Sequence, residues 1–343
     1  MIAMAPVLAT APRPRPRSTR RAVLATGAAL VLSGCAGAPL PPPDRTPPAE
    51  GAFIMRDGAW LPYRRWLPAG APTVIIRALH GFNDSRDAWE IPAVAFAAAG
   101  FALYAPDQRG FGDAPDRGRW AGVGVLVADA AELARQVRAR HPGVPLVLMG
   151  ESMGGAVLMC LATGPKAPRD ARYVLISPAV WGRETMNVFL RSGLWLAATL
   201  APGLAVSGAP VRVTATDNRA ALQRLSRDPL TIHDTRFDTV RGLVDLMDAA
   251  LSAAPSFRAP GLFLYGGRDE LVPKGAMARM WRALPRGDGA ELAYYPDDYH
   301  LMLRDLGRAA PIGDIVAWVR APGRPLPSGA DAAATAWLAR HEA

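Results

Sequence analysis

The chain has 343 residues, 50% of them hydrophobic and 20% charged, a composition typical of a globular protein with a sizeable core and unlike that of a disordered chain. The formal net charge is +9, but the first 34 residues contain five arginines and no acid, so the rest of the chain carries only +4. This remaining positive charge is spread singly, with no basic block interleaved with aromatic residues, which argues against binding to nucleic acid.

The N-terminal segment has the pattern of a bacterial export signal. A basic stretch, residues 13–21, precedes an apolar stretch, residues 22–32, that is too short to span a bilayer as a helix. A Leu-Ser-Gly-Cys motif follows at residues 32–35 and resembles the lipobox of bacterial lipoproteins, in which the cysteine becomes the lipidated first residue after cleavage. The sequence therefore predicts a signal peptide over residues 1–34 and lipidation of Cys35.

This interpretation predicts an exported protein, anchored through the lipid on Cys35 to a bacterial membrane on its periplasmic or cell-surface side. Residues 19–24 also resemble a twin-arginine signal, so the general secretion route and the twin-arginine route both stay open. An uncleaved N-terminal anchor is the alternative, and it gives the same compartment. The next segment, residues 35–50, is rich in proline and is expected to be an extended tether, with a proline-rich ligand for a partner domain as the weaker alternative.

A folded body is predicted from residue 51 to about residue 320. It begins with a hairpin, residues 53–55 and 60–66, whose turn is Asp57-Gly58. Further strands are predicted at residues 73–79, 102–104, 144–149, 173–176, 261–265 and 291–295, and helices at residues 88–99, 122–140, 274–284 and 309–320. Alternation of this kind indicates an α/β fold with a mainly parallel, doubly wound sheet, which binds its ligands at the carboxyl ends of the strands.

Residues 181–258 interrupt this alternation. They contain no strand-like segment, but they include helix-like segments at residues 187–200 and 239–253. A long insertion that returns to the sheet predicts a helical cap over the site, inserted after the strand that ends near Ser177. Residues 321–343 show a short helical pattern without a motif and are interpreted as a C-terminal tail.

Ser152 is the predicted nucleophile. It stands in a Gly-x-Ser-x-Gly motif, residues 150–154, between an apolar strand and a helix, which is the context that a nucleophile elbow requires. The chain contains 33 glycines, so a chance match is the competing interpretation, and the strand-to-helix context favours the elbow. The backbone N–H of Met153 lies at the start of the helix, where it can stabilise the negative charge that develops during acyl transfer.

A serine nucleophile needs a base, and the base needs an acid to orient it. Among the five histidines, His300 follows the last predicted strand, where a loop can place an imidazole beside Ser152. The acid is expected after the preceding strand, at Asp269, with the adjacent Glu270 as the alternative. The loop after the strand at residues 73–79 brings the N–H of Phe82 to the same edge of the sheet as a second oxyanion donor.

These motifs give the chain a family resemblance. Residues 51–320 resemble the α/β-hydrolase superfamily, and within it the monoacylglycerol lipase and lysophospholipase group. The matching segments are residues 80–82, 107–112, 150–155, 177–178 and 226–230 and the surroundings of Asp269 and His300. The resemblance implies a Ser152–Asp269–His300 triad that hydrolyses single-chain lipid esters without a cofactor, and the sequence shows no metal-ligand spacing. Residues 83–84, Asn-Asp, stand where that group usually has a Gly/Glu-type run, so the resemblance does not predict which head group is recognised.

Two alternatives to a lipid esterase stay open. The first keeps the fold and the triad but takes a non-lipid substrate, as a peptidase or as an esterase of polymers or xenobiotics. The second is a non-catalytic surface lipoprotein that uses the same fold for binding. The apolar side chains of residues 186–200 are consistent with an acyl channel in the cap and equally with packing of the cap on the sheet.

Overall fold

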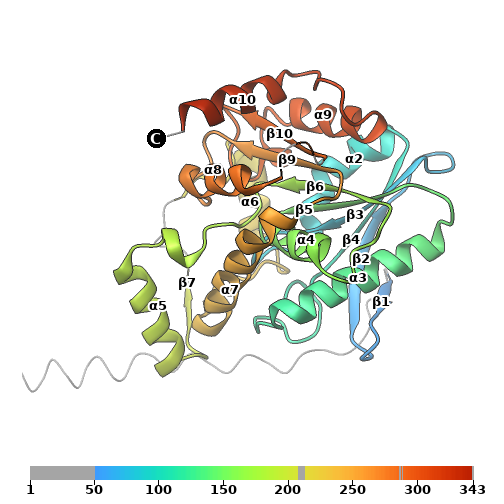
Figure 1. The fold of residues 1–343 in the computed structure, drawn as a ribbon. Helices are drawn as coiled ribbons and strands as arrows, with labels where there is room; N and C mark the ends of the chain where they lie inside the picture. Colours follow the sequence, from blue (N-terminus) through green and yellow to red (C-terminus); the bar gives the residue numbers. More distant parts are fainter. Residues whose placement is uncertain (1–50, 208–212, 286, 288, 342–343) are drawn as a thin grey trace, which may run out of the picture. The chain divides into compact units, whose positions relative to one another are not determined.

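The computed structural model describes residues 51–207, 213–285, 287 and 289–341 (Figure 1). The predicted signal peptide, Cys35 and the predicted tether lie outside the described residues. An eight-stranded sheet lies at the centre of the described chain, in the order β1-β2-β4-β3-β5-β6-β9-β10. This strand order, with its crossovers, is that of the mainly parallel, doubly wound sheet predicted from the sequence.

The strands correspond to the apolar runs of the sequence. β1 (Ala52–Ile54) and β2 (Trp60–Trp66) form the predicted hairpin, and β2 also pairs antiparallel with β4 (Phe101–Pro106). All other neighbouring strands of this sheet are parallel. They are β3 (Val74–Leu79), β5 (Leu146–Glu151), β6 (Ala171–Ile176), β9 (Gly261–Gly266) and β10 (Ala290–Tyr295). Every residue of β3, β5 and β9 is buried, which explains why these strands are largely apolar, with Arg77 in β3 and Glu151 at the end of β5 as the charged exceptions.

Helices cover both faces of this sheet. One face packs against α3 (Val123–Arg140), α4 (Met153–Thr163) and α8 (Lys274–Ala283), and the other against α2 (Glu90–Ala98) and α9 (Ala309–Arg320). Because β3, β5, β9 and β10 are parallel, the loops that follow them leave the sheet at the same edge. Those four loops carry, in order, Phe82, Ser152, Asp269 and His300.

Between β6 and β9 the chain forms a helical insert, residues 181–258. It contains α5 (Val188–Leu200), α6 (Arg219–Arg227) and α7 (Phe237–Ala253), and α7 lies beside α4 (Figure 1). The expectation that this region lacks strands is wrong. β7 (Ala205–Ser207) pairs antiparallel with β8 (Asp234–Arg236), and each has three residues, too few for an alternating pattern to be recognised in the sequence.

The C-terminal segment forms part of the core. After α9 the chain continues into α10 (Ala330–Arg340), which packs against β10 (Figure 1). Its Trp337 is only 2% exposed and contacts the rings of Tyr265, Trp281 and Tyr294. The segment interpreted as a tail therefore contributes a large aromatic side chain to the packing behind β9 and β10.

Candidate active site

Ser152 lies in a strained turn between β5, which ends at Glu151, and α4, which begins at Met153. Its φ is 53° and its ψ −114°, a backbone conformation that residues with a side chain rarely adopt. Backbone hydrogen bonds fix this conformation, because the Ser152 N–H donates to the carbonyl of Ile176 at 2.9 Å and its carbonyl accepts the N–H of Ala179 at 3.0 Å. The local geometry is that of a nucleophile elbow.

Glycines allow this nucleophile turn, residues 150–154, to pack closely. A Cβ atom at Gly154 would lie 2.3 Å from the carbonyl oxygen of Leu79 in β3, and one at Gly150 would lie 2.5 Å from the carbonyl carbon of Gly154. On the other side, a Cβ atom at Gly81 would lie 3.4 Å from the Cβ of Ser152. The oxyanion loop, residues 80–85, therefore lies directly against the nucleophile turn.

His300 and Asp269 are in contact and buried. The Nδ1 atom of His300 lies 2.8 Å from Oδ2 of Asp269, and the two residues are 3% and 6% exposed. The other carboxylate oxygen of Asp269 accepts the backbone N–H groups of Leu271 at 2.8 Å and Val272 at 2.9 Å. The backbone thus fixes the carboxylate, and the carboxylate orients the imidazole so that Nε2 is left for chemistry.

The alternative acid, Glu270, has a different partner. Its Oε2 atom accepts the backbone N–H of Thr214 at 2.6 Å, and its side chain lies at the surface. Of the two adjacent acids, only Asp269 contacts His300 among the residues that the structure describes. The geometry therefore favours Asp269 over Glu270 as the acid.

The charges around His300 favour its protonated form. Burial by itself lowers the pKa of His300, but the carboxylate of Asp269 and, further away, that of Glu151 outweigh burial, so the pKa lies above its ordinary value of 6.5. Arg304 acts in the opposite direction. An imidazole so placed readily holds the proton that it takes from a serine hydroxyl.

The Ser152 hydroxyl has no hydrogen-bond partner in the described part of the chain, so the structure brings Asp269 and His300 together but records no bond between His300 and Ser152. The two residues nonetheless belong to neighbouring loops, because Arg304, four residues after His300, bonds to Glu151, next to Ser152. Hydrogen bonds of this kind often close only when the substrate is bound.

Two backbone N–H groups are suited to hold an oxyanion. Met153 is the first residue of α4, so its N–H has no acceptor within the helix. No hydrogen bond from the Phe82 N–H is recorded within residues 51–207, 213–285, 287 and 289–341, and the loop that carries it lies against Ser152. The Phe82 ring packs edge-on against Phe111 with the centroids 5.6 Å apart, which holds the loop in place.

His80, to which no role is assigned from the sequence, shapes the oxyanion loop. It is fully buried, and burial lowers its pKa to about 4, so its ring is neutral at physiological pH. The ring accepts the backbone N–H of Gln108 at Nε2 (3.0 Å), which assigns the proton to Nδ1, 2.8 Å from the carbonyl of Gly81. His80 therefore ties the oxyanion loop to the loop after β4.

A buried ion cluster that the sequence does not predict lies beside the nucleophile turn. Nη2 of Arg304 lies 2.6 Å from Oδ2 of Asp84 and 2.6 Å from Oε2 of Glu151, and all three residues are less than 7% exposed. Asp84 belongs to the oxyanion loop and Glu151 to the nucleophile turn. Sequence spacing cannot reveal this cluster, because its members come from three distant segments.

The model of the family described as serine aminopeptidase, S33, matches residues 70–307, which include all of the loops described above. This chain belongs to that family. A monoacylglycerol lipase from Mycolicibacterium smegmatis is 26% identical over 280 residues, covering 79% of this chain and 96% of that protein. The human monoglyceride lipase is 27% identical over 259 residues, covering 74% of this chain and 84% of its own length.

Solved structures of the same architecture resemble this S33-family chain. A soluble variant of monoglyceride lipase from Saccharomyces cerevisiae, in complex with a substrate analogue, superposes with a TM-score of 0.68 at 20% identity, covering 82% of this chain and 98% of that one. The monoacylglycerol lipase of Paleococcus ferrophilus gives a TM-score of 0.64 at 22% identity, over 76% and 98% of the two chains. The predicted α/β-hydrolase fold is confirmed.

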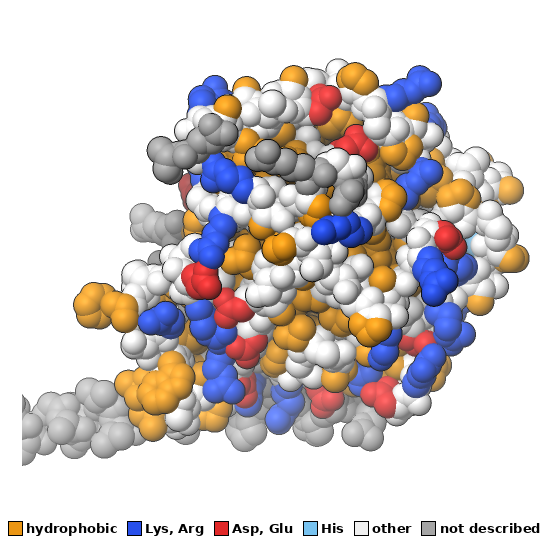
Figure 2. All heavy atoms as spheres, viewed as in Figure 1, with side chains coloured by type: hydrophobic (Ala, Val, Ile, Leu, Met, Phe, Trp, Pro, Cys, Tyr) orange, Lys and Arg blue, Asp and Glu red, His pale blue; other side chains and the backbone are white. Residues whose placement is uncertain are grey.

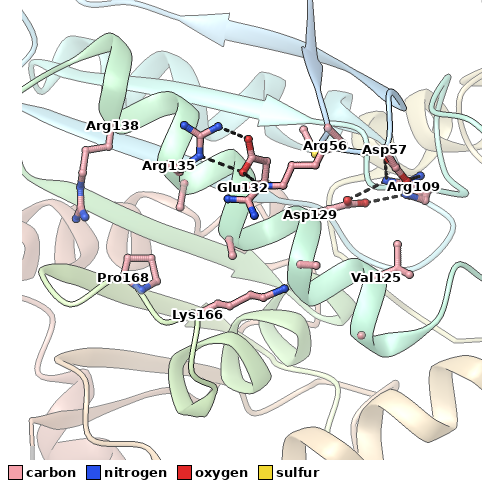
Figure 3. A pocket seen from close by; sticks show the side chains of 15 residues that line it. Arg56, Asp57, Arg109, Val125, Asp129, Glu132, Arg135, Arg138, Lys166 and Pro168 are labelled. Atoms are coloured by element: carbon pink, nitrogen blue, oxygen red, sulfur yellow. Dashed lines mark hydrogen bonds and ion pairs between the residues drawn. The ribbon is translucent and has the colours of Figure 1, made fainter.

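One cavity of this S33-family protein lies away from the candidate triad. It has a volume of about 590 Å³, runs along α3 and is lined by none of Ser152, Asp269 and His300. Figure 3 shows that ion pairs occupy part of its wall, with Arg109 bonded to Asp57 and Asp129. A smaller cavity of about 270 Å³ lies in the insert between α5 and α7.

The apolar side chains of residues 186–200, most of which belong to α5, fully match neither an acyl channel nor packing of the cap on the sheet. Met186, Leu194 and Trp195 line the smaller cavity, but most of the others face solvent, and Phe189 and Leu200 are 85% and 74% exposed. Figure 2 shows hydrophobic side chains gathered over α5. Packing of α5 on the sheet is therefore wrong for most of these side chains. No helix among the described residues combines the length and hydropathy needed to cross a membrane.

Proposed function

We propose that this protein is a serine hydrolase that cleaves carboxylic esters of single-chain lipids, either monoacylglycerols or lysophospholipids. In this proposal Ser152 is the nucleophile, His300 the general base and Asp269 the acid that orients it. The N–H groups of Phe82 and Met153 hold the oxyanion. The observation that carries the proposal is the buried contact between His300 and Asp269 at the strand edge that also presents the strained turn of Ser152.

Carboxylic ester hydrolysis as the class of reaction is confirmed by the family match and by the relatives named as monoacylglycerol and monoglyceride lipases. The triad assignment and the lipid head group belong to the proposal. The exposed apolar side chains of α5 support a lipid substrate, because apolar surface of this kind suits a substrate that is delivered from a lipid aggregate.

The proposal assigns each group a step. Nε2 of His300 takes the proton of the Ser152 hydroxyl as its oxygen attacks the ester carbonyl, and the two N–H groups stabilise the resulting oxyanion. The imidazolium then donates that proton to the departing alkoxide, which leaves as the alcohol, and an acyl-enzyme remains. Water, deprotonated by His300, attacks the acyl-enzyme and releases the fatty acid, and the proton returns to Ser152.

The family description keeps a peptidase as the competing function. An aminopeptidase must hold the positive amino group of its substrate, usually with a free carboxylate beside the scissile bond. The acids that flank the proposed reacting groups, Asp84 and Glu151, are both bonded to Arg304. Neither acid is therefore free to hold an amino group, which favours a lipid ester over an aminoacyl substrate.

The test is hydrolysis by the purified protein of a monoacylglycerol series and a lysophospholipid series of increasing acyl length, beside an aminoacyl anilide. We expect turnover of the esters, a preference for longer chains and no release of the anilide. Ser152→Ala is the matched control and should reduce ester turnover by about 10⁴-fold or more. Equal activity of the two proteins would refute the nucleophile, and anilide turnover would favour the peptidase.

The location of the protein is a further part of the proposal. The lipobox-like motif supports lipidation of Cys35 and anchoring to a bacterial membrane on the periplasmic or cell-surface side. The exposed apolar residues of α5 offer a second contact with such a membrane. Cys35→Ser should move the protein from the membrane fraction to the soluble exported fraction with its esterase kcat/KM unchanged. Unchanged fractionation would refute lipidation.

A further inference from the structure

The oxyanion loop, the nucleophile turn and the segment that carries His300 meet at one buried guanidinium. Arg304 belongs to a short 3₁₀ turn (Met302–Arg304) that follows His300 in the chain. One nitrogen, Nη2, bonds to both Asp84 and Glu151 at 2.6 Å. These two carboxylates stand two residues after Phe82 and one residue before Ser152. No other ion pair among the described residues joins these three segments.

We propose that Arg304 is a positioning residue that clamps the oxyanion loop to the nucleophile turn. This inference rests on the proposed function, since it assigns Phe82 and Met153 as the two oxyanion donors. The distance between those donors depends on how the oxyanion loop sits against the nucleophile turn. Arg304 sets this distance through Asp84 on one side and Glu151 on the other, and it touches neither the substrate nor the reacting atoms.

Burial explains why the clamp needs the positive charge of Arg304. Two carboxylates placed together in a buried site repel each other and lack water to solvate them, so they require the positive charge between them. Other contacts fix the Asp84 side: its Oδ1 accepts the N–H of Ser85 at 2.8 Å, which leaves Oδ2 directed at Arg304. Without the guanidinium, the loop can relieve the repulsion by moving away from the nucleophile turn.

The clamp also affects the general base. The charged groups that face His300 are Asp269 on the loop after β9 (the acid loop, residues 267–273), Glu151 on the nucleophile turn and Arg304 on its own segment, with Asp84 beyond Arg304. Asp269 and Glu151 favour the imidazolium, and Arg304 opposes it. Removing the positive charge while both carboxylates remain therefore raises the pKa of His300, and the neutral base then appears only at higher pH.

The experiment compares Arg304→Gln and Arg304→Lys with the wild-type full chain. Gln keeps a donor nitrogen without the charge, and Lys keeps one charged nitrogen, which is all that the present geometry uses. We measure kcat and KM on a monoacylglycerol, the pH profile of kcat/KM, and the rate at which a fluorophosphonate labels Ser152. Thermal unfolding of each variant establishes that it is folded.

We expect Arg304→Gln to reduce kcat and the labelling rate by about 10- to 100-fold, the size of effect caused by a misplaced oxyanion donor. KM should change by less than about threefold, because the clamp does not touch the substrate. The acid limb of the pH profile should move to higher pH. Arg304→Lys should restore most of the rate and the wild-type limb.

Arg109→Gln is the matched control. Arg109 also binds two carboxylates, Asp57 and Asp129, and its side chain is 11% exposed, but it contacts no group of the triad or the oxyanion pair (Figure 3). If Arg109→Gln lowers the rate and moves the pH limb as Arg304→Gln does, the effect is general and the clamp is wrong. A folded Arg304→Gln with wild-type rates and pH limb also overturns it.

Two further measurements distinguish failure of the clamp from failure of the proposed function. If Arg304→Gln does not fold, Asp84→Asn tests the same clamp, because it neutralises the link on the oxyanion loop; unchanged labelling of Ser152 in that variant overturns the inference. If the wild-type protein neither hydrolyses the ester nor reacts with the fluorophosphonate, the proposed function itself fails. If the wild type is active and Arg304→Gln has wild-type rates, the clamp is wrong and the proposed function stands.

Discussion

Two adjacent acids have different roles in this structure. Asp269 and Glu270 occupy consecutive positions after β9, and the sequence alone kept both as partners of the base. In the structure only the first contacts His300, while the second accepts a backbone N–H at the surface. The two side chains also differ in how they are held, because the Asp269 carboxylate accepts the N–H groups of Leu271 and Val272 in its own loop. Sequence position therefore placed the candidate acid within one residue, and in the structure only Asp269 contacts the proposed base.

This difference predicts the result of a paired substitution. Asp269→Asn keeps the size of the side chain but removes the charge and favours the wrong imidazole tautomer, so kcat should fall by about 10⁴-fold, as for the acid of other serine triads. Glu270→Gln should leave kcat within about threefold of the wild type, because Glu270 has no contact with His300. Steady-state kinetics on one ester, with thermal unfolding of both variants, checks this. A larger loss in Glu270→Gln would reverse the assignment.

The pKa of His300 predicts the acid limb of activity. The base must be neutral to accept the Ser152 proton, and the pKa of His300 is raised by Asp269 and Glu151, so kcat/KM should rise with pH through a midpoint above about 6.5. His80 cannot account for such a limb, because burial holds its pKa near 4. The pH profile of kcat/KM in a constant-ionic-strength buffer measures the midpoint. A midpoint below pH 6 would contradict the proposed base.

At the scale of elements, the nucleophile turn depends on close contact between α4 and β3. The contact at Gly154 involves the backbone of Leu79, which cannot move aside as a flexible side chain can. The motif places a glycine at this position, and the structure shows that β3 is the strand that requires it. The same motif gave the positions of β5 and α4, because a buried strand, a tight turn and a helix follow one another within a short stretch of chain.

Gly154→Ala should therefore lower both stability and activity. Alanine favours a helix over glycine by about 1 kcal/mol, but here the added Cβ would lie 2.3 Å from a carbonyl oxygen, and overpacking of this kind costs about 1–3 kcal/mol. Gly313→Ala in α9 is the control, because that position is exposed and a Cβ there has no neighbour within 4 Å. Urea unfolding should show destabilisation in the first variant and none in the second. Equal stability of the two would mean that α4 and β3 can separate without cost.

The elements that sequence reasoning missed lack a local signal. β7 and β8 have three residues each, and their pairing joins segments that lie on either side of α6. The contacts of Arg304 and His80 depend on which loops meet at the edge of the sheet, which no periodicity records. The long strands and helices could be predicted, because their apolar periodicity extends over many residues. The acid and base loops could be placed because a parallel sheet puts the ends of its strands together.

At the scale of the whole molecule, the C-terminal helix supports the acid loop through the core. Trp337 of α10 packs against Tyr265 of β9, with ring centroids 5.5 Å apart. The hydroxyl of Tyr265 donates to the carbonyl of Val272 at 2.8 Å, and the N–H of Val272 donates to Asp269. The segment interpreted from its sequence as a tail is thus connected to the candidate triad by packing and two hydrogen bonds.

This connection predicts that Trp337→Ala will destabilise the whole domain and reduce its activity. Deleting a buried tryptophan typically costs about 3–5 kcal/mol, and here the cavity would open beside Tyr265, Trp281 and Tyr294. The loss should appear as a lower melting temperature and, below that temperature, as a lower kcat caused by a looser acid loop. Thr335→Ala, on the exposed side of the same helix, should match the wild type in both measurements. If Trp337→Ala melted at the wild-type temperature, α10 would be an appendage and the tail interpretation would be right.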